Sequence, residues 1–151
     1  MSLPSLRGLA AAVTVTAGLA LALLDDETRA FQDALIGGPP PLGPGAPAAE
    51  RLHAFGDGYL DLVERHASLL MAAVPLRRGP SGPDLVYATH LAILLREAAP
   101  ALDPEFTAWA LLATLHPTRH LQARNGLGWP VERLRAGWHA LVDALCGARS
   151  S

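Results

Sequence analysis

Apolar residues recur at intervals of three and four along nearly the whole chain, and this spacing restricts the fold most strongly. Such spacing places apolar side chains on one face of an α-helix. The composition agrees, because Ala and Leu supply 28 residues each of the 151, whereas Val, Ile and Thr together supply only 16. Ala and Leu favour helices, and β-branched residues favour strands. We therefore expect an all-α protein built as a bundle of about five helices.

Proline and glycine mark the expected ends of these helices, because proline starts or breaks a helix and glycine often ends one. In chain order, we expect an extended connection over Gly37–Gly45, a helix from Pro47 to about Val74, a loop over Arg77–Pro83, a helix that ends before Pro100, a helix that begins at Asp103 and is kinked or broken at Pro117, and a last helix from Pro130. The last two helices are expected to form an antiparallel hairpin.

Two glycines, Gly56 and Gly58, lie inside the expected second helix. Each costs about 1 kcal/mol relative to alanine in a helix. They therefore either weaken the prediction of a helix or mark places where a neighbouring element approaches closely.

The stretch Gly8–Leu24 contains no charged residue and follows Arg7, so it resembles a secretory signal peptide. It is short for a membrane span, which needs about 20 apolar residues. However, an apolar stripe continues through it at helical spacing, over Leu21, Leu24, Thr28, Phe31 and Leu35. This continuity favours a helix buried in a cytoplasmic protein without membrane association. The alternative is an exported or membrane-anchored helical protein with residues 1–24 as a signal sequence.

Charge and motifs exclude several functions. The net charge is −2 and there is no basic block, so no footprint for nucleic acid is present. The one cysteine, Cys146, has no partner for an internal disulfide. The GxGxxG, GxxxxGK[ST], HExxH, GxSxG and CxxC patterns are absent. We therefore expect neither an enzyme nor a cofactor.

Several stretches resemble the C-terminal half of TetR-family transcriptional regulators, most closely the SbtR-like type. They are LALLDDETRAFQDAL, PAAERLHAFGDGYLDLVERHASLLMAA, THLAILLREAAPALDPEFTAWALLATLHPTRHLQ and PVERLRAGWHALVDAL. Together they span about Leu19 to Leu145. The segment AAAVTV resembles the start of the second helix of the family's DNA-binding head, but no recognition helix follows it.

The resemblance implies a regulatory domain over residues 19–151, with residues 1–18 as a residual N-terminal segment. Such a domain binds a small, largely apolar effector inside the bundle and forms a homodimer through its last two helices. DNA would be a partner only if the complete protein carries a helix-turn-helix head.

Effector contacts are expected from aromatic or polar residues on otherwise aliphatic inward faces, since pockets combine apolar walls with a few such groups. These candidates are Phe55, Tyr59, His66, Tyr87, His90 and Trp109. Packing within the core is the alternative for each of them.

The segment Phe106–Leu115 is apolar on nearly every side, so a second copy is expected to cover part of it. The candidate interface residues are Leu111, Leu112, Leu115, Leu134, Trp138, Leu141 and Leu145. Packing within one chain is the alternative.

His116 and His120 have a spacing that suits a metal, but Pro117 lies between them and no third ligand is evident, so no metal site is expected.

Overall fold

The computed structural model describes residues 5–73 and 82–147, and these residues form helices without any strand. The elements are α1 (Leu6–Gly37), α2 (Ala48–Ala73), α3 (Gly82–Ala98), α4 (Pro104–Thr114), the short α5 (Pro117–Leu121), the π-helical turn η2 (Gln122–Gly126) and α6 (Val131–Gly147). Five of these helices have eleven or more residues. The prediction of an all-α bundle of about five helices is therefore confirmed.

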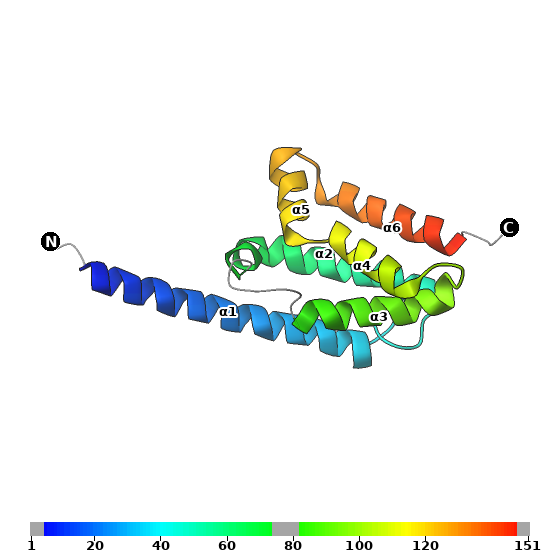
Figure 1. Cartoon of the computed structure of the whole chain (residues 1–151), viewed down its shortest axis with the longest axis horizontal. Helices are drawn as coiled ribbons and strands as arrows, with labels where there is room; N and C mark the ends of the chain where they lie inside the picture. The colour runs from blue at the N-terminus through cyan, green and yellow to red at the C-terminus, as the bar shows by residue number, and fades with distance from the viewer. Residues whose placement is uncertain (1–4, 74–81, 148–151) are drawn as a thin grey trace.

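Helix α2 lies at the centre of the bundle (Figure 1). Helices α1 and α3 pack on one side of it, α6 packs on another, and α4 packs mainly against α3. The two helices expected to form a hairpin thus have different main neighbours, because α4 lies on α3 and α6 lies on α2. The indole Nε1 of Trp138 fixes α6 to α2 by donating to the carbonyl oxygen of Leu52 at 2.9 Å.

Helix α1 is continuous through the uncharged stretch and the charged region after it. Its C-terminal half packs on the bundle, where Leu24 and Leu35 are buried as the apolar stripe predicts. Residues 5–19 are exposed throughout, and this part of α1 projects beyond the other helices (Figure 1). Among the described residues, α1 is the one helix long and apolar enough to cross a membrane.

The connection between α1 and α2 differs from the extended form that its prolines suggested. It folds into turns, with a cis peptide bond between Pro40 and Pro41 and a bond from the Gly43 amide to the carbonyl oxygen of Pro39 at 3.0 Å. Leu42 packs against the core. The compact loop thus allows partial burial of this leucine. The expected loop over Arg77–Pro83 lies mostly outside the described residues, and α3 begins at Gly82.

The start of α4 and its break follow the expected chemistry. The carboxylate of Asp103 accepts the Phe106 amide at 3.0 Å, and Pro104 occupies the first turn. The helix ends at Thr114, and α5 starts at Pro117, so this proline breaks the segment rather than kinking it.

Candidate functional site

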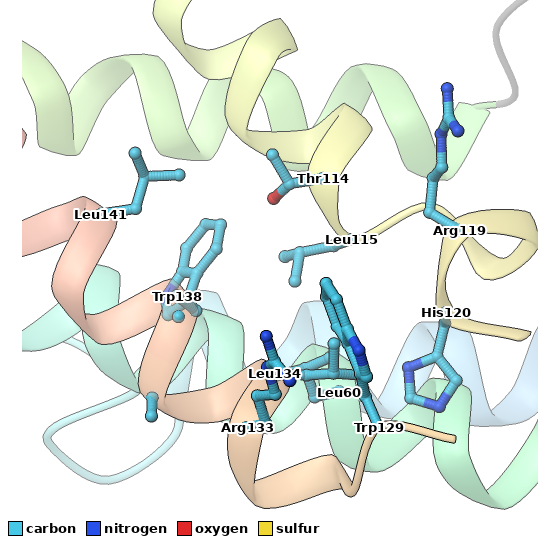
Figure 2. A pocket seen from close by; sticks show the side chains of 12 residues that line it. Leu60, Thr114, Leu115, Arg119, His120, Trp129, Arg133, Leu134, Trp138 and Leu141 are labelled. Atoms are coloured by element: carbon cyan, nitrogen blue, oxygen red, sulfur yellow. The ribbon is translucent and has the colours of Figure 1, made fainter. Parts of the chain in front are cut away.

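A half-open cleft of about 480 Å³ lies between α2, α5 and α6 (Figure 2). Its walls are mainly apolar and come from α2, the end of α4, α5, the loop before α6, and α6 itself. The lining residues are Leu60, Thr114, Leu115, Arg119, His120, Trp129, Arg133, Leu134, Ala136, Gly137, Trp138 and Leu141.

The cleft lies where the chain changes direction between α4 and α6. After α5, the turn η2 and the left-handed Gly128 (φ +67°) reverse the chain before α6 begins. The guanidinium of Arg124 donates to the carbonyl oxygen of Trp129 at 2.9 Å and holds this reversal in place. These interruptions position Trp129 at the cleft, beside the N-terminal part of α6.

A hydrogen-bonded network supports the α5 wall from behind. The carboxylate of Glu64 lies 2.5 Å from His120 Nε2 and accepts from Arg124 Nη2 at 2.9 Å. The bond from Arg124 is the main cause of a lowered pKa of Glu64, so this carboxyl is ionised at neutral pH. The network joins α2 to α5 and η2, and it orients the buried His120 ring.

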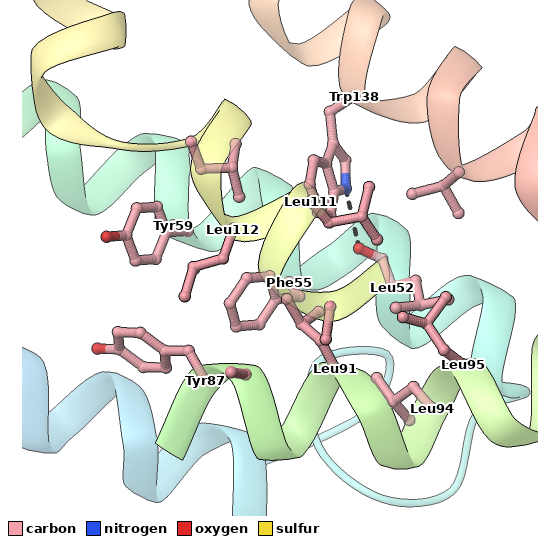
Figure 3. Close-up of a cluster of buried hydrophobic side chains, with 14 of the residues drawn as sticks. Leu52, Phe55, Tyr59, Tyr87, Leu91, Leu94, Leu95, Leu111, Leu112 and Trp138 are labelled. Carbon is pink, nitrogen blue, oxygen red and sulfur yellow. Dashed lines mark hydrogen bonds between the residues drawn. The ribbon is translucent and has the colours of Figure 1, made fainter. Parts of the chain in front are cut away.

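Three of the six predicted effector contacts belong to the core. Phe55, Tyr59 and Tyr87 are buried (Figure 3), and their rings contact one another and the ring of Phe31 with centroid separations between 5.4 and 6.2 Å. Aromatic pairs at these separations stabilise a core. Phe31 belongs to α1, so this cluster joins α1, α2 and α3.

The other three predicted contacts lie apart from one another. His66 occupies a kink in α2, where its backbone is non-helical, and its Nε2 lies 3.6 Å from a carboxylate oxygen of Glu27. Trp109 is 41% exposed and lines a shallow groove between α3 and α4. His90 is half-buried beside Phe55. None of the six lines the cleft, and their role in effector binding stays a prediction.

His90 makes stability depend on pH. Its pKa is lowered to about 4 from 6.5, first by burial and then by the charge of Arg51. The unfolded chain therefore binds this proton near pH 6.5, and the folded chain binds it only near pH 4. The stabilising contribution of neutral His90 is complete above pH 6.5 and is lost as the pH falls to about 4. We therefore expect the free energy of unfolding to decrease by about 1–2 kcal/mol as the pH is lowered over this range, a value that allows for the partly exposed ring.

The check is urea unfolding of the wild type and His90→Leu between pH 7 and pH 4. The difference in unfolding free energy between the two proteins isolates His90 from other titrating groups. As the pH falls, we expect the unfolding free energy of the wild type to decrease more than that of His90→Leu. A difference that is constant with pH would contradict the assignment.

The predicted dimer residues divide into two groups. Leu111, Leu112, Leu115 and Trp138 are buried within the chain, so packing inside one copy already accounts for them. Leu134 and Leu145 are half-buried, and Leu141 is 38% exposed. The exposed part of α6 thus remains available to a second copy, and the prediction of a dimer stays open.

The histidines four residues apart have separate partners. His116 caps α5, with its Nδ1 accepting the Thr118 amide at 3.2 Å, whereas His120 contacts Glu64. In residues 5–73 and 82–147, no three His, Cys, Asp or Glu side chains are grouped to hold a metal ion. Burial raises the pKa of the Cys146 thiol, which disfavours the reactive thiolate.

The sequence analysis did not predict that four residues of the cleft belong to one site. They are Arg119, His120, Trp129 and Arg133. One available signal was the spacing of four between Trp129 and Arg133 around a helix start, which brings the two side chains together. Comparison of the chain with protein-family models, with curated proteins and with solved structures finds no match.

Proposed function

We propose that this chain is the effector-sensing and dimerising domain of a TetR-like cytoplasmic transcriptional regulator. The observation that carries the proposal is the cleft beside α6, which combines a binding volume with residues predicted for the dimer interface. Leu115, Leu134, Trp138 and Leu141 belong to both sets.

The cleft has the size and lining of a small-molecule site. Its volume of about 480 Å³ falls within the range of about 300–1,000 Å³ that is usual for ligand pockets. Leucine and tryptophan side chains supply apolar surface, and a few polar groups stand among them. An effector here would be largely apolar, as the sequence leads us to expect, but its contacts would come from α2, α5 and α6.

Sharing of residues between the cleft and the dimer face provides a mechanism. An effector that packs against Leu134 and Leu141 alters the surface that a second copy contacts. Effector affinity and dimer geometry are then thermodynamically linked, so each shifts the populations of the other. In a complete regulator, this shift would change the spacing of two DNA-binding heads, if such heads are present.

A charge on the exposed part of α6 is expected to separate the dimer. Leu141→Glu places a carboxylate on the proposed contact surface, and we expect the dimer dissociation constant to rise about 30-fold or more. Sedimentation velocity over a concentration series measures this change. Trp138 is unsuitable for the test, because it is buried and hydrogen-bonded within the chain.

The matched control is Ile93→Glu, which introduces the same charge at a 55% exposed residue of α3 outside the cleft. The control is expected to keep the dimer. An unchanged dissociation constant for Leu141→Glu, or dissociation by the control as well, would contradict this interface.

The exposed half of α1 favours a second candidate, a membrane-anchored or exported helical protein. The large side chains of Leu9, Val13 and Leu19 are exposed there. The hydroxyls of Thr14 and Thr16 donate to helix carbonyl oxygens at 2.9 Å, which satisfies them without water. This candidate predicts recovery of the chain with membranes, or removal of about 22 residues by signal cleavage.

A further inference from the structure

Two arginines of the cleft have no acidic partner among the residues that the structure describes. Within the part of the chain that the structure describes, most arginines pair with a carboxylate, and those without an ion pair are Arg7, Arg51, Arg119 and Arg133. Arg119 and Arg133 both line the cleft, and among the described residues no aspartate or glutamate lines it with them. The charge of the cleft is therefore complementary to an anion.

The Arg133 guanidinium is positioned against an aromatic ring. Its central carbon lies 4.0 Å from the centroid of the Trp129 ring, a distance suited to a cation–π contact. Such stacking orients the guanidinium and leaves its N–H groups free to bind an acceptor. Figure 2 shows Arg133 and Trp129 close to Leu134 and Leu60, so the charged group adjoins apolar surface.

Arg119 lies on the α5 side of the cleft, apart from Arg133 (Figure 2). Its Nη1 donates to Gln122 Oε1 at 3.5 Å, which is a weak contact. The side chain of His120 beside it is almost fully buried, and its Nδ1 has no hydrogen-bond partner in the described structure. His120 Nδ1 is thus a buried polar atom of the α5 wall without a hydrogen-bond partner among the described residues.

We propose that the cleft binds a small amphipathic anion, with an apolar body and one carboxylate-type head group. The head group accepts hydrogen bonds from Arg133, and the apolar body packs against Leu60, Leu115 and Trp138. Arg119 adds a second positive charge on the far side. This assignment names the effector class and rests on the proposed function of the cleft as an effector site.

A series of three probes with one chain length tests the proposal. Decanoate, decanol and decylammonium share an apolar body and differ in the charge of the head group. Isothermal titration calorimetry of the full chain is expected to show decanoate binding at least about tenfold more tightly than decanol. Decylammonium is expected to bind most weakly, because the described residues that line the cleft include two arginines and no acidic residue.

Substitution of the two cleft arginines identifies the residue that binds the anionic head group. Arg133→Gln is expected to weaken decanoate binding about tenfold while leaving decanol binding unchanged, and Arg119→Gln is expected to have a smaller effect. The control is Arg29→Gln on α1, whose arginine is exposed and makes a 3.8 Å contact with Asp26. Far-ultraviolet circular dichroism confirms that each variant is folded.

The outcomes separate this inference from the proposed function. Equal affinity for all three probes would contradict an anionic head group and would leave the cleft as an apolar effector site. Preferred binding of decanoate that survives Arg133→Gln would overturn the assignment of the head group. Failure of every probe to bind would overturn both the anion and the small-molecule site.

Discussion

Replacement of Gly56 by alanine is expected to lower the free energy of unfolding by about 3 kcal/mol. A Cβ atom at this position would lie 2.0 Å from Trp138 Nε1 and 2.2 Å from Cδ1. The indole ring is buried and bonded to the Leu52 carbonyl oxygen, so it has no space to move away. Overpacking and loss of this hydrogen bond together exceed the gain of about 1 kcal/mol that alanine gives within a helix.

Urea unfolding followed by circular dichroism measures the change. The matched control is Gly137→Ala in α6, where an added Cβ would have no atom within 4 Å. That control is expected to gain about 0.5–1 kcal/mol from helix propensity alone. A Gly56→Ala variant as stable as the wild type would show that α6 does not approach α2 in this way.

Removal of the Glu64 carboxylate is expected to cost about 2 kcal/mol at neutral pH. Glu64→Ala leaves the buried His120 without its acceptor and Arg124 without its ion pair. Because the pKa of Glu64 is lowered, its contribution is complete above about pH 4.5 and is lost as the pH falls further. The cost of the substitution should therefore shrink in acid, as unfolding experiments at pH 7 and pH 3.5 would measure.

Glu105→Ala provides the comparison for this prediction. Glu105 pairs with Arg96, but both side chains are more than half exposed, so the loss is expected to stay below about 1 kcal/mol. Equal costs for the two substitutions would mean that the network behind α5 behaves as an ordinary surface ion pair.

The helices could be predicted from the sequence because their determinants are local. Asp103 and Pro104 start α4, and the spacing of Leu24 and Leu35 identified the buried face of α1. The expectation that Gly56 or Gly58 marks a close approach is also confirmed, since an added Cβ would meet Trp138 at the first and Phe31 at the second. Periodicity therefore gave the elements and their inward faces.

Periodicity does not identify the partner of an apolar face. The sequence pattern predicted Leu111, Leu112 and Trp138 as dimer-interface residues, yet they are buried by the chain's own helices. The cleft was missed for a related reason, since it depends on how the chain turns between α4 and α6. The π turn and the left-handed Gly128 bring together residues from four helices and the loop before α6, and the spacing of residues within one helix does not encode that arrangement.

Native mass spectrometry of the intact chain, purified from cells, distinguishes an effector-sensing domain from an exported or membrane-anchored protein. For an effector-sensing domain we expect a dimer in the soluble fraction, with residues 1–24 retained and a small anionic adduct released on denaturation. A monomer shortened by about 22 residues would indicate a cleaved signal sequence. That result, or recovery of the chain only with membranes, would contradict a role as an effector-sensing domain.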